Sequence, residues 1–193
     1  TICAALDARF VAFDKDARVE CEPLLVGGAP TEWPQVDEQQ LIEDVRRTLY
    51  ACKICSYSQG LNLIRKASEE EGWGVDLGES ARIWKGGCII RARFLESIQA
   101  AYRTEGKLPN LLLDPQLGGF LQQHQTAWRR VVATAAERGV PVLAMAASLS
   151  YFDSYRRAAL PQNLTQAQRD LFGAHTFERV DKPAGEWFHH DWQ

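Results

Sequence analysis

The sequence predicts an all-α fold, and three observations predict it. Apolar residues recur at intervals of three and four over long stretches. No segment of more than four residues shows the clean alternation of apolar and polar side chains that is typical of a strand. Glycine and proline residues stand between the periodic segments, at positions where they end helices. We therefore expect a domain built from several helices.

The first predicted helix covers residues 1 to about 22 and ends near Pro23. Its apolar pattern runs from Ile2 to Phe13. Residues 26–36 are predicted to form a loop, because they contain two glycines and two prolines in VGGAPTEWPQV. The chain starts at Thr1, without a methionine and inside a helical pattern, so we expect further residues upstream.

A long helix is predicted from Asp37, a plausible N-cap, to about Glu71. At about 1.5 Å per residue such a helix spans roughly 50 Å, which is typical of a large helical domain or a dimer. The small residues in its middle indicate close packing on more than one side. Its predicted apolar stripe contains Ile42, Val45, Leu49, Cys52, Leu63 and Ala67.

Shorter helices follow the break at Gly72 to Gly78. They are expected near residues 79–85, 88–105, 115–138, 141–159 and 163–172. Gly139 is predicted to end one of them as a C′ residue, and Pro141 to open the next at an N1 position. The remaining residues, 173–193, are predicted to form an irregular or extended tail.

Composition excludes several classes of protein. The net charge of −3 argues against a broad surface for nucleic acid or anionic lipid, which needs an excess of lysine and arginine. A helical nucleic-acid binder that uses the paired arginines is a poor alternative, since no aromatic platform lies near them. The longest apolar run, residues 140–152, has about 13 residues, whereas a membrane span needs about 20. An odd number of cysteines, 5, and no visible signal peptide favour a soluble cytoplasmic protein.

One motif near the end, QAQRDLFGAHTFERVD, combines a cation with a titratable ring. Arg169 and His175 stand on either side of Gly173, and a kink at that glycine would let both bend toward one anion. Arginine offers a planar fork of donors that matches phosphate or carboxylate, and histidine adds a donor whose charge is set near neutral pH. The alternative from spacing alone is a solvated helix end followed by a loop.

Arg9 is the third candidate anion-binding residue. It lies on the first predicted helix between Leu6, Phe10 and Phe13. A cation beside an apolar stripe marks either an anion site or a buried salt bridge, and the alternative is an arginine that extends to solvent. The residues by themselves do not favour a functional role for Arg9 over a solvated side chain.

Two other motifs give weaker evidence for a functional site. Cys52 and Cys55 form a CxxC, but within a helix and without a second ligand pair, so two small thiols on a packed face are favoured over a redox or zinc site. His189-His190-Asp191 could start a metal site, although adjacent histidines point apart, so a structural role is favoured. No metal is predicted. No glycine-rich phosphate loop or nucleophile elbow follows a strand.

Together these blocks resemble the C-terminal helical domain of 6-phosphogluconate dehydrogenases, essentially from end to end. The matching segments include ALDARF at 5–10, IWKGGCIIRARFLESI at 83–98 and LLLDP at 111–115. The most specific is QAQRDLFGAHTFE at 166–178. The resemblance implies an all-α, multi-helix domain over 1–172 for substrate binding and dimerisation, with an extended C-terminal tail over 173–193.

The resemblance also implies a function. The family oxidises and decarboxylates 6-phosphogluconate to ribulose 5-phosphate and carbon dioxide, a step of the pentose phosphate pathway and of gluconate utilization, and reduces NADP. A Rossmann domain, absent from this chain, binds the cofactor. The helical domain forms a homodimer, and its tail enters the other subunit. The substrate phosphate is held by the residue matching Arg9 and by the other subunit's residues matching Arg169 and His175.

The family's general acid and base lie outside this chain, so no catalytic residue is assigned here and the chain alone is expected to be inactive. The positions of Cys52 and Cys55 commonly hold other residues in the family, which weakens a redox role. The alternative function is a stand-alone, non-catalytic helical module for dimerisation or sugar-phosphate binding.

Overall fold

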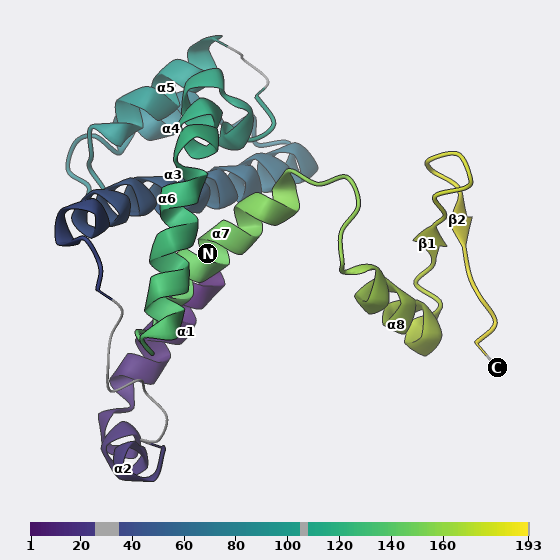
Figure 1. Ribbon diagram of the computed structural model, residues 1–193. Helices are drawn as coiled ribbons and strands as arrows, with labels where there is room; N and C mark the ends of the chain where they lie inside the picture. Colours follow the sequence, from purple (N-terminus) through teal and green to yellow (C-terminus); the bar gives the residue numbers. More distant parts are fainter. Residues whose placement is uncertain (26–34, 105–107, 193) are drawn as a thin grey trace. The chain divides into compact units, whose positions relative to one another are not determined.

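The computed structural model describes residues 1–25, 35–104 and 108–192 (Figure 1). Its internal contacts divide it into two compact units, Thr1–Phe152 and Asp153–Gln193. The all-α prediction is confirmed: helices make up most of the described residues, and the only strands among them are the two of one short hairpin. Within those residues, no helix is both long and apolar enough to cross a membrane. The predicted functional boundary between residues 172 and 173 stays a prediction.

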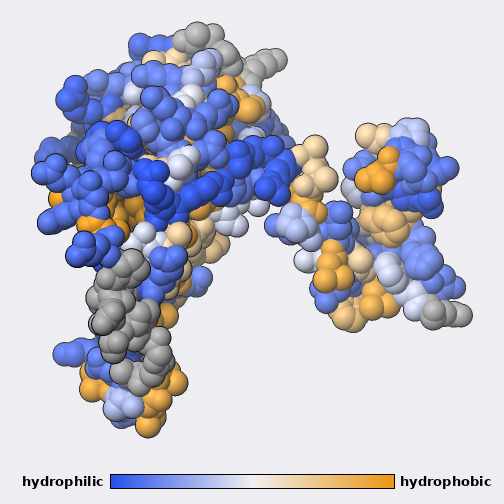
Figure 2. Space-filling view, viewed as in Figure 1, coloured by the Kyte–Doolittle hydropathy of each residue, from blue (hydrophilic) through white to orange (hydrophobic). Residues whose placement is uncertain are grey.

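The N-terminal residues form two helices, where the apolar pattern predicted one. Helix α1 covers Ile2–Phe13 and α2 covers Lys15–Leu25, and they meet at Asp14, whose ψ of 68° lies outside the helical region. The predicted end at Pro23 was wrong, because Pro23 lies inside α2. Neither helix contains a buried residue, and Figure 2 shows apolar side chains on the surface of α2. The predicted loop over 26–36 falls largely outside the described residues.

The long helix α3 covers Glu38–Glu71, with the predicted start and end. The N-cap prediction is confirmed, since Oδ1 of Asp37 accepts a hydrogen bond of 3.1 Å from the backbone N–H of Gln40. Gly72 ends the helix in the left-handed region, with a φ of 68°.

The predicted apolar stripe of α3 was assigned to the wrong face. Ile42, Leu49 and Leu63 are 62%, 53% and 69% exposed. The buried face consists mostly of short side chains, which allow close approach of α6 and of the 3-10 helix η1. Helix α3 therefore uses small residues for the core and leaves a bulky apolar stripe on the surface. Its buried residues are Asp44, Thr48, Ala51, Ile54, Cys55, Ser58, Leu61 and Ser68.

Helices α4 and α5 pack against each other, beside α3. Helix α4 covers Leu77–Ile83 and α5 covers Phe94–Thr104. The prediction that the second helix starts at residue 88 was wrong, because 88–93 forms turns after Gly87, whose φ is 67°. The ring of Phe94 meets the α3 residues Tyr50 and Tyr57 edge-on, at centroid distances of 5.5 and 5.3 Å.

The 3-10 helix η1 (Leu111–Leu113) leads into α6 (Pro115–Glu137). Asp114 caps α6, with Oδ1 accepting hydrogen bonds from Gln116 and Leu117. A Cβ at Gly118 would lie 2.4 Å from the carbonyl oxygen of Leu112, so only glycine allows this close approach.

Helix α7 covers Leu143–Tyr155, which is shorter at both ends than predicted. Gly139 adopts the predicted left-handed conformation, with a φ of 64°, but Pro141 precedes the helix and does not open it. The two helices α6 and α7 meet around Trp128, which is completely buried. Its Nε1–H donates to the carbonyl oxygen of Met145, and its ring stacks on Phe152 at 6.0 Å.

An ion pair between a buried aspartate and an exposed arginine joins α3 to α6. The Asp44 carboxylate accepts two hydrogen bonds from the Arg130 guanidinium, at 2.7 and 2.8 Å, and one from the side chain of Gln40. The Arg130 hydrogen bonds outweigh the effect of burial and hold the pKa of Asp44 below its usual value. Asp44 therefore contributes to stability at neutral pH, and this contribution is lost in acid as the pH falls through the folded-state pKa.

The second unit consists of α8 and a hairpin. Helix α8 covers Asn163–Gly173, close to the prediction. The tail was expected to be irregular or extended, and it contains two short antiparallel strands, β1 (Phe177–Glu178) and β2 (Trp187–Phe188). Two residues are too few for alternation to reveal a strand.

Candidate functional site

Arg169 lies in the second half of α8, on the surface of the second unit. One turn earlier on the same helix, Oε1 of Gln166 accepts a hydrogen bond of 3.0 Å from Nη1 of Arg169. The cation is therefore held by a neutral partner, which leaves its charge available to an anion.

His175 lies in the turn that follows α8, and its side chain is exposed. The predicted kink at Gly173 was wrong, because Gly173 is the last residue of α8. The left-handed residues are Ala174 and Thr176, with φ values of 49° and 63°. Gly173 instead leaves room for the histidine ring: a Cβ there would lie 3.3 Å from both Cδ2 and Nε2 of His175.

Asp170 is the centre of this unit, although no pattern in the sequence points to it. Its side chain is 0% exposed and accepts four hydrogen bonds of 2.8 to 3.0 Å. Oδ1 accepts from the Thr176 N–H and from Nδ1 of His189, and Oδ2 accepts from the His190 N–H and from Nε1 of Trp192. All four lone-pair directions of the carboxylate are used.

The electrostatics of Asp170 follow from these contacts. Burial by itself raises the pKa of a carboxyl, but the hydrogen bonds from His189, His190, Trp192 and Thr176 hold the pKa of Asp170 well below its usual range. The residue is ionised at neutral pH. An aspartate on a short polar helix gives no sign in the sequence that it is buried, because the donors come from 6 to 22 residues further along the chain.

The tail histidines have the structural role that was favoured over a metal site. The ring of His189 contacts Asp170, and the ring of His190 meets Trp192 edge-on at 4.9 Å. Within the described residues, no group of three or more potential metal ligands gathers. The HHDW segment therefore ties the end of the tail to α8.

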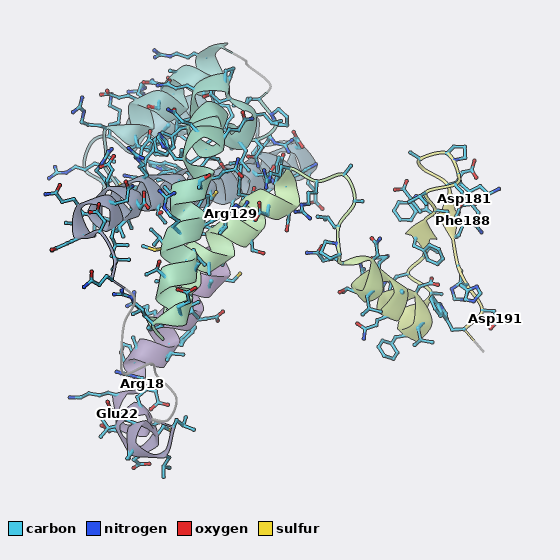
Figure 3. The ribbon with its side chains drawn as sticks, in the orientation of Figure 1. Arg18, Glu22, Arg129, Asp181, Phe188 and Asp191 are labelled. Atoms are coloured by element: carbon cyan, nitrogen blue, oxygen red, sulfur yellow. The ribbon has the colours of Figure 1, made fainter. Side chains whose placement is uncertain are left out.

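The hairpin carries a second cation. Both nitrogens that Arg179 directs at Asp181 lie within 2.8 Å of its carboxylate oxygens, and the Arg179 guanidinium lies 5.6 Å from the ring centroid of Phe188. Figure 3 labels Asp181 and Phe188 in the hairpin. Because an anionic partner already neutralises Arg179, it is a weaker candidate for substrate than Arg169.

Arg9 belongs to the first unit and lies on α1 with its side chain exposed. Its neighbours Leu6, Phe10 and Phe13 are 51%, 69% and 82% exposed. The buried salt bridge considered for Arg9 is therefore not formed. An exposed cation among exposed apolar side chains is typical of a surface that another molecule covers. The assignment of Arg9, Arg169 and His175 to substrate stays a prediction.

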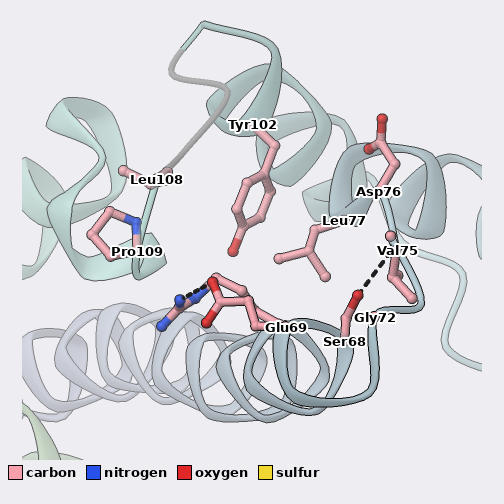
Figure 4. A pocket seen from close by; sticks show the side chains of 11 residues that line it. Ser68, Glu69, Gly72, Val75, Asp76, Leu77, Tyr102, Leu108 and Pro109 are labelled. Carbon is pink, nitrogen blue, oxygen red and sulfur yellow. Dashed lines mark hydrogen bonds and ion pairs between the residues drawn. The ribbon is translucent and has the colours of Figure 1, made fainter.

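The first unit also contains a cleft of about 830 Å³ between the end of α3 and the residues that follow α5 (Figure 4). Its walls include Arg65, Glu69 and Tyr102. Arg65 pairs with Glu69 at 2.6 Å, and burial raises the pKa of Tyr102 to about 12. None of the three predicted substrate residues lines this cleft.

Comparison with known proteins decides the family. The profile described as "6-phosphogluconate dehydrogenase, C-terminal domain" matches residues 1–192. The chain belongs to the 6-phosphogluconate dehydrogenase family. The resemblance inferred from the QAQRDLFGAHTFE block is thereby confirmed.

Relatives within the family are similar over the whole chain. The rice protein 6-phosphogluconate dehydrogenase, decarboxylating 1 (Oryza sativa subsp. japonica) is 56% identical over 192 residues, which cover 100% of this chain and 39% of the rice protein. The 6-phosphogluconate dehydrogenase, decarboxylating, of Synechocystis is 53% identical over the same share of each. The chain thus spans about 39% of the length of these relatives.

A solved structure from the same family supports the fold. It is that of Plasmodium falciparum 6-phosphogluconate dehydrogenase, described in its apo form and in complexes with its cofactor NADP+ and its substrate 6-phosphogluconate. The two structures match with a TM-score of 0.88 and 42% sequence identity. The matched region covers 98% of this chain and 40% of the Plasmodium chain.

The two cysteines of the CxxC lie at the edge of the packed side of α3. Cys55 is buried and Cys52 is half-buried. Burial raises the pKa of Cys52 to about 11 and that of Cys55 to about 12. A thiol with such a pKa is protonated at neutral pH, whereas redox and metal chemistry require the thiolate. Packing of two small side chains accounts for the motif.

We expect Cys52 and Cys55 to resist alkylation in the folded chain at pH 8. The thiolate fraction of a thiol with a pKa of about 11 is on the order of one in a thousand at that pH. Iodoacetamide labelling followed by peptide mass spectrometry measures this, and all five cysteines should react in denaturant. Rapid native labelling of Cys55 would contradict the packed environment described above.

Proposed function

We propose that this chain is the substrate-binding and dimerisation part of an NADP-dependent, decarboxylating 6-phosphogluconate dehydrogenase. The reaction converts 6-phosphogluconate and NADP to ribulose 5-phosphate, carbon dioxide and NADPH, in the pentose phosphate pathway. The observation that carries the proposal is the match of residues 1–192 to the C-terminal domain of this family. Relatives that are more than half identical over the whole chain carry this activity in their names.

The proposed role of the chain is to bind the phosphate group of the sugar acid. Arg9 of one subunit would meet Arg169 and His175 of the tail of the other. Three donors around a dianion supply both charge and direction. Binding energy at the phosphate, remote from the reacting carbons, orients the substrate for oxidation and decarboxylation elsewhere in the enzyme.

Exposed apolar side chains support a homodimer with exchanged tails. Helix α1 exposes Phe10 and Phe13, and α3 exposes Ile42, Leu49 and Leu63. The second unit exposes further large apolar groups, which include Leu164, Phe172, Val180 and Trp187. A monomer rarely leaves so many large apolar side chains in water, so we assign these surfaces to contacts between two copies.

NADP is assigned to the part of the relatives that lies outside this chain. A dinucleotide is held by a strand, a glycine-rich turn and a helix in succession. The two strands among the described residues belong to one short hairpin and do not build such a site. We assign the proton-transfer groups to the same outside part, and derive no step that involves the cofactor here.

We further propose that the protein works in the cytoplasm. All five cysteines are free, and two of them lie on exposed positions of α1 and α2. Exposed thiols persist in a reducing compartment. Detection of the protein in a cytosolic fraction checks this proposal, and an organelle location would contradict it.

Mixed dimers test the proposed function and the tail exchange together. The holoenzyme joins this chain to the NADP-binding domain of the family, and Arg9→Ala and Arg169→Ala are introduced into separate copies. Each variant alone is expected to be nearly inactive at low substrate concentration. When the two are co-expressed, one site of each mixed dimer combines an intact Arg9 with an intact tail. About a quarter of wild-type activity should therefore return, since about half of the dimers are mixed and half of their sites are intact.

Tail exchange is contradicted if the mixed dimers regain no activity. If Arg9 and Arg169 act within one subunit, every site of the mixed dimer carries one substitution and no activity returns. If neither substitution alone affects the oxidation of 6-phosphogluconate, the assignment of this surface to substrate fails. A wild-type holoenzyme that does not reduce NADP with 6-phosphogluconate would overturn the proposed reaction itself.

A further inference from the structure

His175 is held in a turn that its own backbone disfavours. The residues on both sides of it, Ala174 and Thr176, have φ values of 49° and 63°. A left-handed conformation costs a residue with a Cβ roughly 1 kcal/mol or more. Contacts from outside the turn must therefore stabilise it, and α8 provides them.

Two side chains of α8 bind both backbone polar groups of Thr176. Nε2 of Gln166 donates a hydrogen bond of 2.6 Å to the Thr176 carbonyl oxygen. Oδ1 of Asp170 accepts one of 2.9 Å from the Thr176 N–H. The residue directly after His175 is therefore fixed to the helix at two points, which sets the direction in which the histidine leaves the turn.

Gln166 also connects this turn to Arg169. Its Oε1 accepts from Nη1 of Arg169 at 3.0 Å, while its Nε2 donates to the turn. Both ends of the amide are used, so the orientation of the amide is fixed. A single side chain thus joins the cation to the turn that carries the histidine.

Asp170 adds a further connection. Its second oxygen accepts from the His190 N–H and the Trp192 Nε1–H, so the end of the tail depends on the same carboxylate as the turn. All four lone-pair positions of the Asp170 carboxylate therefore accept a hydrogen bond. An asparagine has the same shape, but its NH2 group would face two of these donors and break both hydrogen bonds.

We propose that Gln166 and Asp170 are positioning residues, which hold Arg169 and His175 in a fixed arrangement for the phosphate group of the sugar acid. This inference rests on the proposed function, since it assumes that Arg169 and His175 bind substrate. A preformed pair of donors loses less conformational entropy on binding than two independent side chains. Neither Gln166 nor Asp170 needs to touch the substrate.

The test uses the holoenzyme with Gln166→Leu and Asp170→Asn. Each is expected to raise KM for 6-phosphogluconate about tenfold, which corresponds to one hydrogen bond to a charged group, and to change kcat less than about threefold. Turnover of gluconate, which lacks the phosphate, should not change. The matched controls are Gln168→Leu on the exposed side of α8 and Asp181→Asn in the hairpin, and both should retain the wild-type KM.

A double-mutant cycle separates positioning from general stability. In an Arg169→Ala, His175→Ala background, Gln166→Leu should raise KM less than about twofold further, because its effect acts through the arginine and through the turn that carries the histidine. A full tenfold effect in that background would overturn the inference. Gln166→Leu keeps all four hydrogen bonds of Asp170, so it remains informative if the tail of Asp170→Asn unfolds, which trypsin cleavage would report.

The outcomes also distinguish the inference from the proposed function. If Arg169→Ala and His175→Ala raise KM but Gln166→Leu matches Gln168→Leu, the positioning role fails and the phosphate site stands. If Arg169→Ala and His175→Ala leave KM unchanged, both fail.

Discussion

Replacing Arg169 with alanine is expected to lower kcat/KM for 6-phosphogluconate about 100-fold, or about 2.7 kcal/mol, in the holoenzyme. The guanidinium offers a planar fork to the phosphate oxygens, and its only hydrogen bond among the described contacts goes to the neutral Gln166. The loss should fall mainly on KM, because the phosphate lies away from the reacting carbons. Steady-state kinetics with 6-phosphogluconate and with gluconate measures it, and only the phosphorylated substrate should be affected.

Arg179→Ala is the matched control for this prediction. Arg179 lies in the same unit, but its charge is already neutralised by Asp181. Its removal should leave kcat/KM within about threefold of wild type. Arg169→Lys should lie between wild type and Arg169→Ala, since lysine keeps the charge and loses the fork. Equal effects of the two alanine variants would show that Arg169 has no special role.

Replacing Trp128 with alanine is expected to destabilise the first unit by about 3–5 kcal/mol. The side chain is completely buried between α6 and α7, and its removal leaves a cavity and loses the hydrogen bond to the Met145 carbonyl oxygen. Because a typical domain is stable by only about 5–15 kcal/mol, the variant should be close to unfolding. Urea unfolding followed by far-ultraviolet circular dichroism measures the change.

Trp73→Ala provides the comparison. Trp73 belongs to the same unit and is 64% exposed, so its loss should cost about 0.5 kcal/mol or less. If both variants unfolded at the same urea concentration as wild type, the burial of Trp128 between α6 and α7 would be contradicted.

Helix ends were predicted well where a local signal exists. Asp37 and Asp114 cap their helices through their own side chains, and Gly72 and Gly139 supply left-handed residues at helix ends. These interactions join residues within a few positions of each other, so the sequence displays them directly. The break at Asp14 was missed because no glycine or proline marks it in the sequence.

The candidate site was predicted in part. Arg169 and His175 were identified by residue type and by the family's motif, and the structure places both in one unit, on the surface. Gln166 and Asp170 were missed, although they lie in the same motif. Their importance depends on contacts with the turn and with the end of the tail, up to 22 residues away.

The sequence by itself determined the all-α class, the helix ends that carry a local cap and membership of the family, because local hydrogen bonds, apolar periods and specific motifs are written in consecutive residues. Only the tertiary structure decided which face of α3 is buried and which residues fix His175. An apolar stripe looks the same whether it meets the core or a second molecule, and Asp170 looks like any surface carboxylate. Burial and hydrogen-bond partners depend on what the rest of the chain brings to each position, and that is settled only when the chain folds.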